Sequence, residues 1–164
     1  MKGLILAGGS GTRLRPLTHT GPKQLIPIAN RPNILYCLED LRDAGITDIG
    51  VILGDNQPEK VRELRKDGRD FGVRITYIVQ GAPRGIAHAI GCAEDFLRGG
   101  PFCVYLGDNL LKGGIKGMVD EFVAGDAAAG IALCHVSEPG RFGVAEVDAS
   151  GRVLRLVEKP KEPK

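Results

Sequence analysis

The hydrophobic positions of this chain fall into short segments with two alternating periods. Continuous or alternating apolar residues predict five strands, at residues 2–7, 49–53, 73–79, 102–106 and 131–136. Between them, apolar residues at helical spacing and helix-start prolines predict helices over residues 32–44, 58–66, 85–97 and 115–123. This alternation predicts the α/β class, with a mostly parallel sheet in a three-layer α/β/α arrangement and right-handed crossovers.

The chain ends in a different pattern. Residues 143–147 and 153–157 flank the polar turn Asp148-Ala149-Ser150-Gly151 and predict a strand pair or hairpin. Residues 158–164 carry no packing signal. Because no repeat or low-complexity linker interrupts the sequence, we expect one domain over residues 1–164, cut from a longer chain at its carboxyl end.

Charge and composition narrow the classes of function. The 164 residues include 22 Lys plus Arg against 20 Asp plus Glu, a formal net charge of +2. This near balance lacks the strong basic field of a dedicated nucleic-acid binder. No apolar run approaches the ~18 residues of a membrane span, and the first run is too short for a signal peptide. We therefore expect a cytoplasmic protein without a nucleic-acid or membrane partner.

The cysteines and histidines show no metal-binding spacing. The cysteines stand far apart and form no C-x-x-C pair: Cys37, Cys92, Cys103 and Cys134. We expect them to be buried, reduced thiols. We interpret His88 and His135 as packed or surface residues rather than as catalytic bases.

A glycine-rich loop follows the first predicted strand, where open α/β sheets bind ligands. Gly8, Gly9 and Gly11 let backbone N–H groups turn toward a phosphate. Arg13 can pair with phosphate oxygens, and Lys23 follows ten residues later. The loop matches neither the Walker A pattern nor the dinucleotide fingerprint, which disfavours an NAD-dependent oxidoreductase. The alternative is a simple turn beside a surface arginine.

Two further strand ends carry candidate ligands. Asp108 follows the fourth predicted strand, beside a glycine. Its carboxylate is a suitable ligand for a Mg²⁺ ion, with phosphate oxygens and water completing the coordination shell. An Asx turn or helix cap is the alternative for this aspartate. Gln80 ends the third strand, and its amide offers the donor and acceptor that read a nucleobase edge. It could equally be a satisfied polar residue at a strand end.

Glu158 and Lys159 are adjacent on the last predicted strand, where neighbouring side chains point to opposite faces. One could bind sugar hydroxyls while the other reaches a phosphate. An exposed ion pair is the alternative interpretation.

Taken together, these segments resemble the signature of the sugar-1-phosphate nucleotidylyltransferases. Residues 6–18 (LAGGSGTRLRPLT) and 22–28 (PKQLIPI) match its first motif, and 106–109 (LGDN) and 157–160 (VEKP) match later ones in order. Residues 19–25 (HTGPKQL) and 80–88 (QGAPRGIAH) are similar to the long-form subgroup of glucose-1-phosphate thymidylyltransferases. The resemblance covers essentially the whole chain. It implies a Rossmann-like fold of the nucleotide-diphospho-sugar transferase type and condensation of dTTP with glucose 1-phosphate.

The resemblance also implies roles for individual residues. Arg13 and Lys23 would be catalytic, stabilising phosphate charge, and Asp108 would hold Mg²⁺. The nucleotide, dTTP or UTP, would be bound by Gly8, Gly9, Gly11, Thr12, Arg13, Gln80 and Gly85. The sugar 1-phosphate would be bound by Gly143, Glu158 and Lys159. Family members commonly form homo-oligomers, which we expect here as well.

The chain departs from this family pattern at several positions. Phe142 stands where short-form enzymes have Tyr, and Arg84 and His88 stand where they have Asp and Gln. The family's second metal-binding Asp follows the last motif and lies beyond Lys164. Thymine and uracil differ by one methyl, worth ~1–3 kcal/mol in a pocket, so a UTP-dependent or other sugar specificity stays open. A nucleotide-binding fragment without turnover is the alternative from another class.

Overall fold

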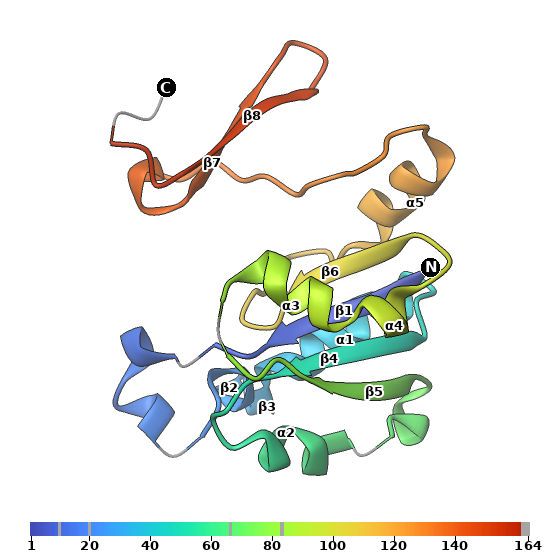
Figure 1. Ribbon diagram of the computed structural model, residues 1–164, viewed down its shortest axis with the longest axis vertical. Helices are drawn as coiled ribbons and strands as arrows, with labels where there is room; N and C mark the ends of the chain where they lie inside the picture. Colours follow the sequence, from blue (N-terminus) through green and yellow to red (C-terminus); the bar gives the residue numbers. More distant parts are fainter. Residues whose placement is uncertain (10, 20, 66, 83, 162–164) are drawn as a thin grey trace. The chain divides into compact units, whose positions relative to one another are not determined.

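The computed structural model describes residues 1–9, 11–19, 21–65, 67–82 and 84–161 (Figure 1). The chain divides into two compact units, Met1–Gly125 and Asp126–Lys164. The division falls at the end of the last predicted helix, before the predicted fifth strand. In the part of the chain that the structure describes, the helices are too short or too polar to span a lipid bilayer.

The first unit is built on a parallel sheet of four strands: β1 (Lys2–Ala7), β4 (Asp48–Leu53), β5 (Arg74–Val79) and β6 (Phe102–Leu106). Their order is β5-β4-β1-β6, so the chain winds outward to β5 and then returns to the other side of β1. The strand order therefore reverses between β1 and β6, the kind of position where such sheets bind ligands. All four strands confirm the sequence prediction.

Helices cover both faces of this sheet, which confirms the three-layer arrangement (Figure 1). The larger core lies under α1 (Asn33–Asp43), α2 (Pro58–Arg65) and α5 (Lys116–Ala124). The smaller core lies under α3 (Ile86–Cys92) and α4 (Glu94–Leu97). Successive side chains of β1 point to opposite faces of the sheet and so contribute to both cores. Leu4 is fully buried in the smaller core, and Ile5 is fully buried in the larger one.

The predicted helix over residues 85–97 is wrong as a single element. It is broken at Ala93, whose N–H bonds the Ile90 carbonyl three residues back before α4 begins. Gly91, a poor helix former, precedes the break. The predicted apolar stripe is also interrupted at its start, because Ile86 is 53% exposed.

Short elements between β1 and α1 escaped the sequence prediction. Three 3₁₀ helices follow β1: η1 (Thr12–Leu14), η2 (Leu17–His19) and η3 (Lys23–Leu25). The two-residue strands β2 (Pro27–Ile28) and β3 (Arg31–Pro32) then form a small antiparallel pair. A further 3₁₀ turn, η4 (Arg69–Phe71), precedes β5. Such short segments carry too few residues for a hydrophobic period.

The second unit contains the predicted hairpin. After η5 (Pro139–Arg141), β7 (Gly143–Val147) pairs antiparallel with β8 (Val153–Glu158). The Asp148 carboxylate accepts hydrogen bonds from the Ser150 N–H at 2.9 Å and the Arg152 N–H at 3.0 Å, which closes the turn. These bonds and one from the Ser150 hydroxyl, which is the largest cause, lower the pKa of Asp148.

Two sequence predictions are wrong in this part of the chain. Residues 131–136 form no strand, because none of the described strands pairs with them, and Ile131 and Leu133 are each 53% exposed. An apolar run becomes a strand only when a neighbour takes up its backbone groups. The cysteines are not uniformly buried either. Cys37 is buried, Cys92 and Cys103 are partly buried, and Cys134 is exposed.

Candidate nucleotide site at the carboxyl edge of the sheet

Loops that follow β1, β4 and β5 enclose a hollow of about 280 Å³ at the carboxyl edge of the sheet. It is lined by Gly8, Gly54, Asp55, Asn56, Gln80, Gly81 and Ala82. Gly8 and Gln80 are candidate nucleotide-binding residues in the sequence, and the structure brings these two together. The part contributed by residues 54–56 was missed, although the four residues 53–56 (LGDN), at the end of β4, repeat the sequence of residues 106–109 at the end of β6.

Two glycines set the floor of this hollow. A Cβ added to Gly54 would lie 2.4 Å from the carbonyl oxygen of Gly8 and 2.8 Å from its Cα. Because backbone atoms cannot yield as a flexible side chain can, only glycine fits at residue 54. A Cβ on Gly8 would in turn lie 2.8 Å from Oε1 of Gln80. The backbones of the first two loops are thus in direct contact beside the glutamine amide.

Lys23 and Asp108 are the charged pair of the site. The Lys23 ammonium both donates a hydrogen bond to and forms an ion pair with the Asp108 carboxylate. The Lys23 side chain lies over Gly9, where an added Cβ would be 2.9 Å from Cε and 3.0 Å from Nζ. Gly11 has a φ of 64°, and its carbonyl accepts a 2.8 Å hydrogen bond from the Thr18 hydroxyl. The predicted glycine loop therefore lies beside the predicted lysine and aspartate.

Buried neighbours fix the segment that carries Asp108. The Gly107 N–H bonds the Leu6 carbonyl at 3.0 Å, and Asn33 Nδ2 donates to the Gly107 carbonyl at 3.4 Å. The Cys37 thiol donates to the Asn109 carbonyl at 3.7 Å. Burial, reinforced by nearby carboxylates, raises the pKa of Cys37 to about 12, so this thiol keeps its proton. Neither the Asx turn nor the helix cap considered for Asp108 is observed among the described hydrogen bonds.

Gln80 and Gly85 meet through a side-chain hydrogen bond. Nε2 of Gln80 donates to the Gly85 carbonyl at 3.3 Å, and Gly85 has a φ of 96°. The same Nε2 lies 3.2 Å from Nδ1 of His88. From the sequence, His88 is expected to be a packed or surface residue rather than a base. Its position one turn into the helix after Gly85 was the available signal for this contact.

The first unit also contains Thr12 and Arg13. Thr12 is exposed in η1; the side chain of Arg13 is outside the described part of the structure. Gly143, Glu158 and Lys159 belong to the second unit.

Within the second unit these three residues lie together. Gly143 pairs with Glu158 across the hairpin. Lys159 lies just past β8, with a φ of 45°, and its ammonium is 3.4 Å from Glu158 Oε1. The expected opposite-face arrangement is wrong, because the strand ends at Glu158 and the left-handed turn brings the side chains together. The ion pair considered as the alternative is observed.

Two buried amides beside the site were also missed. Gln24 is fully buried, and neither its oxygen nor its nitrogen has a hydrogen-bond partner among the described residues. Its Cγ is 3.3 Å from the position of a Cβ on Gly107. Asn33 is 4% exposed, and its Nδ2 donates to the Gly107 carbonyl. Its Oδ1 has no hydrogen-bond partner among the described residues. Their polar character gave no sign of burial in the sequence.

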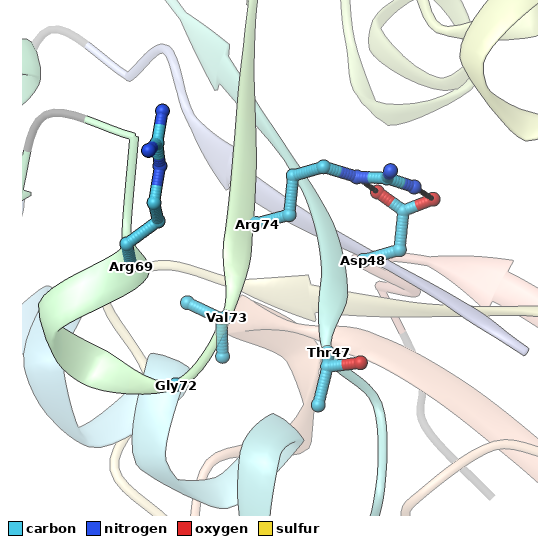
Figure 2. A pocket seen from close by; sticks show the side chains of 6 residues that line it. All are labelled: Thr47, Asp48, Arg69, Gly72, Val73 and Arg74. Atoms are coloured by element: carbon cyan, nitrogen blue, oxygen red, sulfur yellow. Dashed lines mark hydrogen bonds and ion pairs between the residues drawn. The ribbon is translucent and has the colours of Figure 1, made fainter.

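A larger hollow, about 480 Å³, lies at the opposite edge, where β4 and β5 begin (Figure 2). Its charged groups are already satisfied. Arg74 donates to Asp48 at 3.1 and 2.9 Å, and Arg69 is 2.7 Å from Asp67. The Arg74 hydrogen bond lowers the pKa of Asp48. Because parallel sheets place ligands at the other edge, we interpret this hollow as structural.

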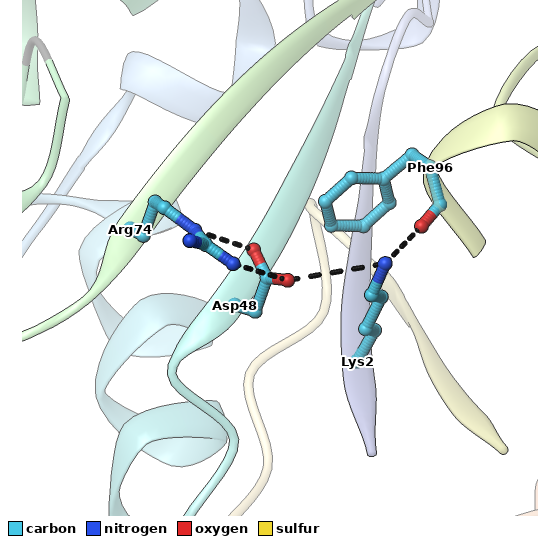
Figure 3. A network of polar contacts seen from close by, with 4 residues as sticks. All are labelled: Lys2, Asp48, Arg74 and Phe96. Carbon is cyan, nitrogen blue, oxygen red and sulfur yellow. Dashed lines mark hydrogen bonds and ion pairs between the residues drawn. The ribbon is translucent and has the colours of Figure 1, made fainter. Parts of the chain in front are cut away.

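The same edge carries a row of charges across three strands (Figure 3). Lys2 on β1 lies 4.0 Å from Asp48 on β4, which is paired with Arg74 on β5. The Lys2 ammonium also donates to the Phe96 carbonyl and lies 4.8 Å from the centroid of the Phe96 ring. This row ties α4 to the sheet.

Comparison with known proteins agrees with the fold just described. The sequence profile described as nucleotidyl transferase matches residues 2–164. The nucleotidyltransferase Agl11 of low-salt glycan biosynthesis in Haloferax volcanii is 58% identical over 99% of this chain. A glucose-1-phosphate thymidylyltransferase from Streptomyces antibioticus is 53% identical over 100% of it. The chain spans 46% of the length of each of these two relatives.

Solved structures give the same result. A Bacillus anthracis protein assigned as a glucose-1-phosphate thymidylyltransferase, in complex with sucrose, superposes with a TM-score of 0.93 at 40% identity. The match covers 99% of this chain and 66% of that one. A UDP-glucose pyrophosphorylase bound to UDP-glucose superposes with a TM-score of 0.74 at 25% identity. This match covers 97% of this chain and 69% of that one. The chain therefore belongs to the nucleotidyl transferase family, whose fold and motifs it carries. Its relatives include sugar-phosphate nucleotidyltransferases.

Proposed function

We propose that this protein condenses dTTP with glucose 1-phosphate, giving dTDP-glucose and pyrophosphate. The observation that carries the proposal is the placement of Lys23 beside Asp108 and over Gly9, where the strand order reverses. This arrangement joins a cation, a carboxylate and a glycine backbone at the ligand-binding edge. The thymidylyltransferase from Streptomyces antibioticus, 53% identical, supports the choice of substrates.

The reaction needs positioning and charge neutralisation more than a side-chain nucleophile. An oxygen of the sugar 1-phosphate attacks the α-phosphorus of dTTP, the bond to the β-phosphate oxygen breaks, and pyrophosphate leaves. Because the attacking phosphate is already ionised at neutral pH, no general base is required. Lys23 would hold phosphate oxygens as charge develops, and we assign the same task to Arg13 and Lys159.

The donor set near Lys23 fits a divalent cation. Magnesium is commonly held by one or two carboxylates together with substrate phosphates and water. Asp108 supplies one carboxylate, 40% exposed, on a segment anchored by Gly107. When bound, Mg²⁺ would neutralise charge on the triphosphate. Lys23, the present partner of Asp108, is long enough to turn instead toward a phosphate.

For the remaining residues we propose the roles expected from the sequence. Gly8, Gly9, Gly11 and Thr12 would hold the nucleotide through backbone and hydroxyl groups, with Gln80 and Gly85 at the base. Gly143 and Glu158 would bind the sugar. We also propose that the protein works in the cytoplasm as a homo-oligomer, as expected from the sequence.

A UTP-dependent pyrophosphorylase is the second candidate. The UDP-glucose pyrophosphorylase that superposes with a TM-score of 0.74 favours it. Base choice between uracil and thymine rests on one methyl group, worth ~1–3 kcal/mol. Nothing in the hollow around Gln80 excludes the smaller base.

The test is pyrophosphate release by the full-length protein supplied with Mg²⁺, glucose 1-phosphate and either dTTP or UTP. We expect release that prefers dTTP, stops when Mg²⁺ is chelated, and is lost in Asp108→Ala. Asp120→Ala is the matched control, since Asp120 is an exposed aspartate paired with Lys116 on α5. Preference for UTP would favour the second candidate. Binding of dTTP without release would leave a nucleotide-binding protein and overturn the proposed reaction.

A further inference from the structure

The amide of Gln80 is held in one of its two orientations. Its Nε2 carries two hydrogens, and two acceptors lie within reach: the Gly85 carbonyl at 3.3 Å and Nδ1 of His88 at 3.2 Å. Its Oε1 points to the other side, against Gly8. Gln80 is only partly buried and lines the hollow. The atom left for a ligand is therefore an acceptor, Oε1.

This orientation depends on the protonation of the His88 ring. Nδ1 can accept from Gln80 only when it carries no hydrogen, which places the ring hydrogen on Nε2. A doubly protonated ring would turn a donor toward the Gln80 donor. The group facing the ring from its own helix is the Cys92 thiol, 4.0 Å from Nδ1 and 3.9 Å from Nε2. Within the described part of the chain, no carboxylate forms an ion pair with His88.

We propose that His88 is a positioning residue for base selection. This inference rests on the proposed function and deepens it. The neutral ring and the Gly85 carbonyl together keep the Gln80 oxygen turned into the site. An acceptor there complements thymine or uracil, whose N3 carries a hydrogen, and opposes cytosine, whose N3 is itself an acceptor. His88 thus acts on the base through Gln80 and makes no contact with the reacting phosphates.

The test compares two variants of the full-length protein. His88→Leu removes the acceptor, whereas His88→Asn offers Oδ1 near the position of Nδ1. His135→Asn is the matched control, an exposed histidine of the second unit. Equilibrium binding of dTTP and dCTP is measured together with kcat and KM for dTTP.

We expect His88→Leu to raise the Kd and KM for dTTP about 5- to 10-fold, the loss of one ordinary hydrogen bond, with kcat within about 2-fold. Its preference for dTTP over dCTP should fall by a similar factor. His88→Asn should restore most of both. A folded His88→Leu with unchanged Kd and preference overturns the positioning role.

A pH series supplies a second measurement that needs no folded His88→Leu. Protonation of Nδ1 would replace the acceptor that faces Gln80 with a donor, so binding is compared at pH 8 and at pH 5.5. Binding of dTTP by the wild type should weaken more steeply across this range than binding by His88→Asn, because the titration of dTTP itself affects both proteins equally. Parallel curves for the two proteins overturn the proposal. A wild type that binds no dTTP overturns the proposed function itself, a result distinct from a wild type that binds and shows no His88 effect.

Discussion

The Lys23 ammonium is paired with the Asp108 carboxylate, although 85 positions separate them in the sequence. The two side chains are 19% and 40% exposed, so the pair is only partly covered from water. It joins the loop after β1 to the end of β6, the two strands between which the sheet reverses its order. The lysine thus neutralises the carboxylate proposed to bind a divalent cation.

Replacing Lys23 tests its role with phosphate. We expect Lys23→Met to lower kcat/KM for pyrophosphate release about 100-fold or more, as removal of a single electrostatic donor does elsewhere. Lys116→Met is the control, because Lys116 forms an exposed pair with Asp120 on α5, and its activity should stay within 2-fold. A Lys23→Met enzyme with activity close to the wild type would remove this lysine from the mechanism.

The contact between Gly54 and Gly8 makes a sharp prediction for stability. Gly54→Ala would place a Cβ 2.4 Å from a backbone oxygen, so the loops must separate. We expect a loss of about 1–3 kcal/mol in the free energy of unfolding, measured by urea titration, and weaker nucleotide binding.

Gly117→Ala is the control for this glycine. Gly117 lies in α5, and an added Cβ would meet no atom within 4 Å. We expect it to raise stability by about 0.5–1 kcal/mol, because alanine favours the helix. Equal effects of the two substitutions would contradict the close approach of the loops.

The Asp48–Arg74 pair predicts a contribution to stability that depends on pH. The pKa of Asp48 is lowered in the folded state, chiefly by its hydrogen bond from Arg74. A lowered carboxyl pKa adds stability above the unfolded value, near 3.9, and this contribution is lost as pH falls through the folded pKa. Asp48→Asn should therefore be destabilised at neutral pH and lose less stability than the wild type below about pH 4.

The measurement for this pair is the unfolding midpoint as a function of pH. Asp120→Asn, in a pair where both side chains are more than half exposed, should follow the wild-type curve closely. If Asp48→Asn followed it as well, the hydrogen-bonded pair would add nothing to stability.

The four cysteines should differ in reactivity. Cys37 is buried with its pKa raised to about 12, whereas Cys134 is exposed. Because the thiolate is the reactive form, iodoacetamide at pH 8 should modify Cys134 and leave Cys37 intact. Mass spectrometry of the digested protein gives the result, and denatured protein serves as the control in which both react. Native modification of Cys37 at the rate of Cys134 would contradict its burial.

The elements that could be predicted from the sequence are those that carry a repeated hydrophobic pattern within their own residues. The strands of the parallel sheet and the helices of its larger core were found because each carries a full hydrophobic period. Residues 131–136 show the limit of that signal, since an apolar run there has no pairing strand among those described. The break at Ala93 was missed because both halves of the helix keep one apolar stripe.

The candidate site could be predicted from the sequence where a motif residue directly follows a predicted strand. Gly8, Gln80 and Asp108 each follow a strand, so a parallel sheet brings them to one edge. The pairing of Asp108 with Lys23 was beyond the sequence, because it depends on three-dimensional placement over 85 positions. The contact of Gln80 with His88 was missed for a different reason. The position of His88, one turn after Gly85, places it near the start of the helix but does not by itself show which side chain its ring contacts.

The two unequal cores imply that the sheet does not hold its layers equally firmly. α3 and α4 rest on a small cluster around Leu4 and are interrupted at Ala93, whereas α1 is anchored by several fully buried side chains. Amide hydrogens of α3 should therefore exchange with deuterium at much lower opening free energy than those of α1. Since α3 also carries His88, a bound nucleotide should slow exchange in this helix selectively. The exchange rate of the α3 amides would therefore indicate whether the site is occupied.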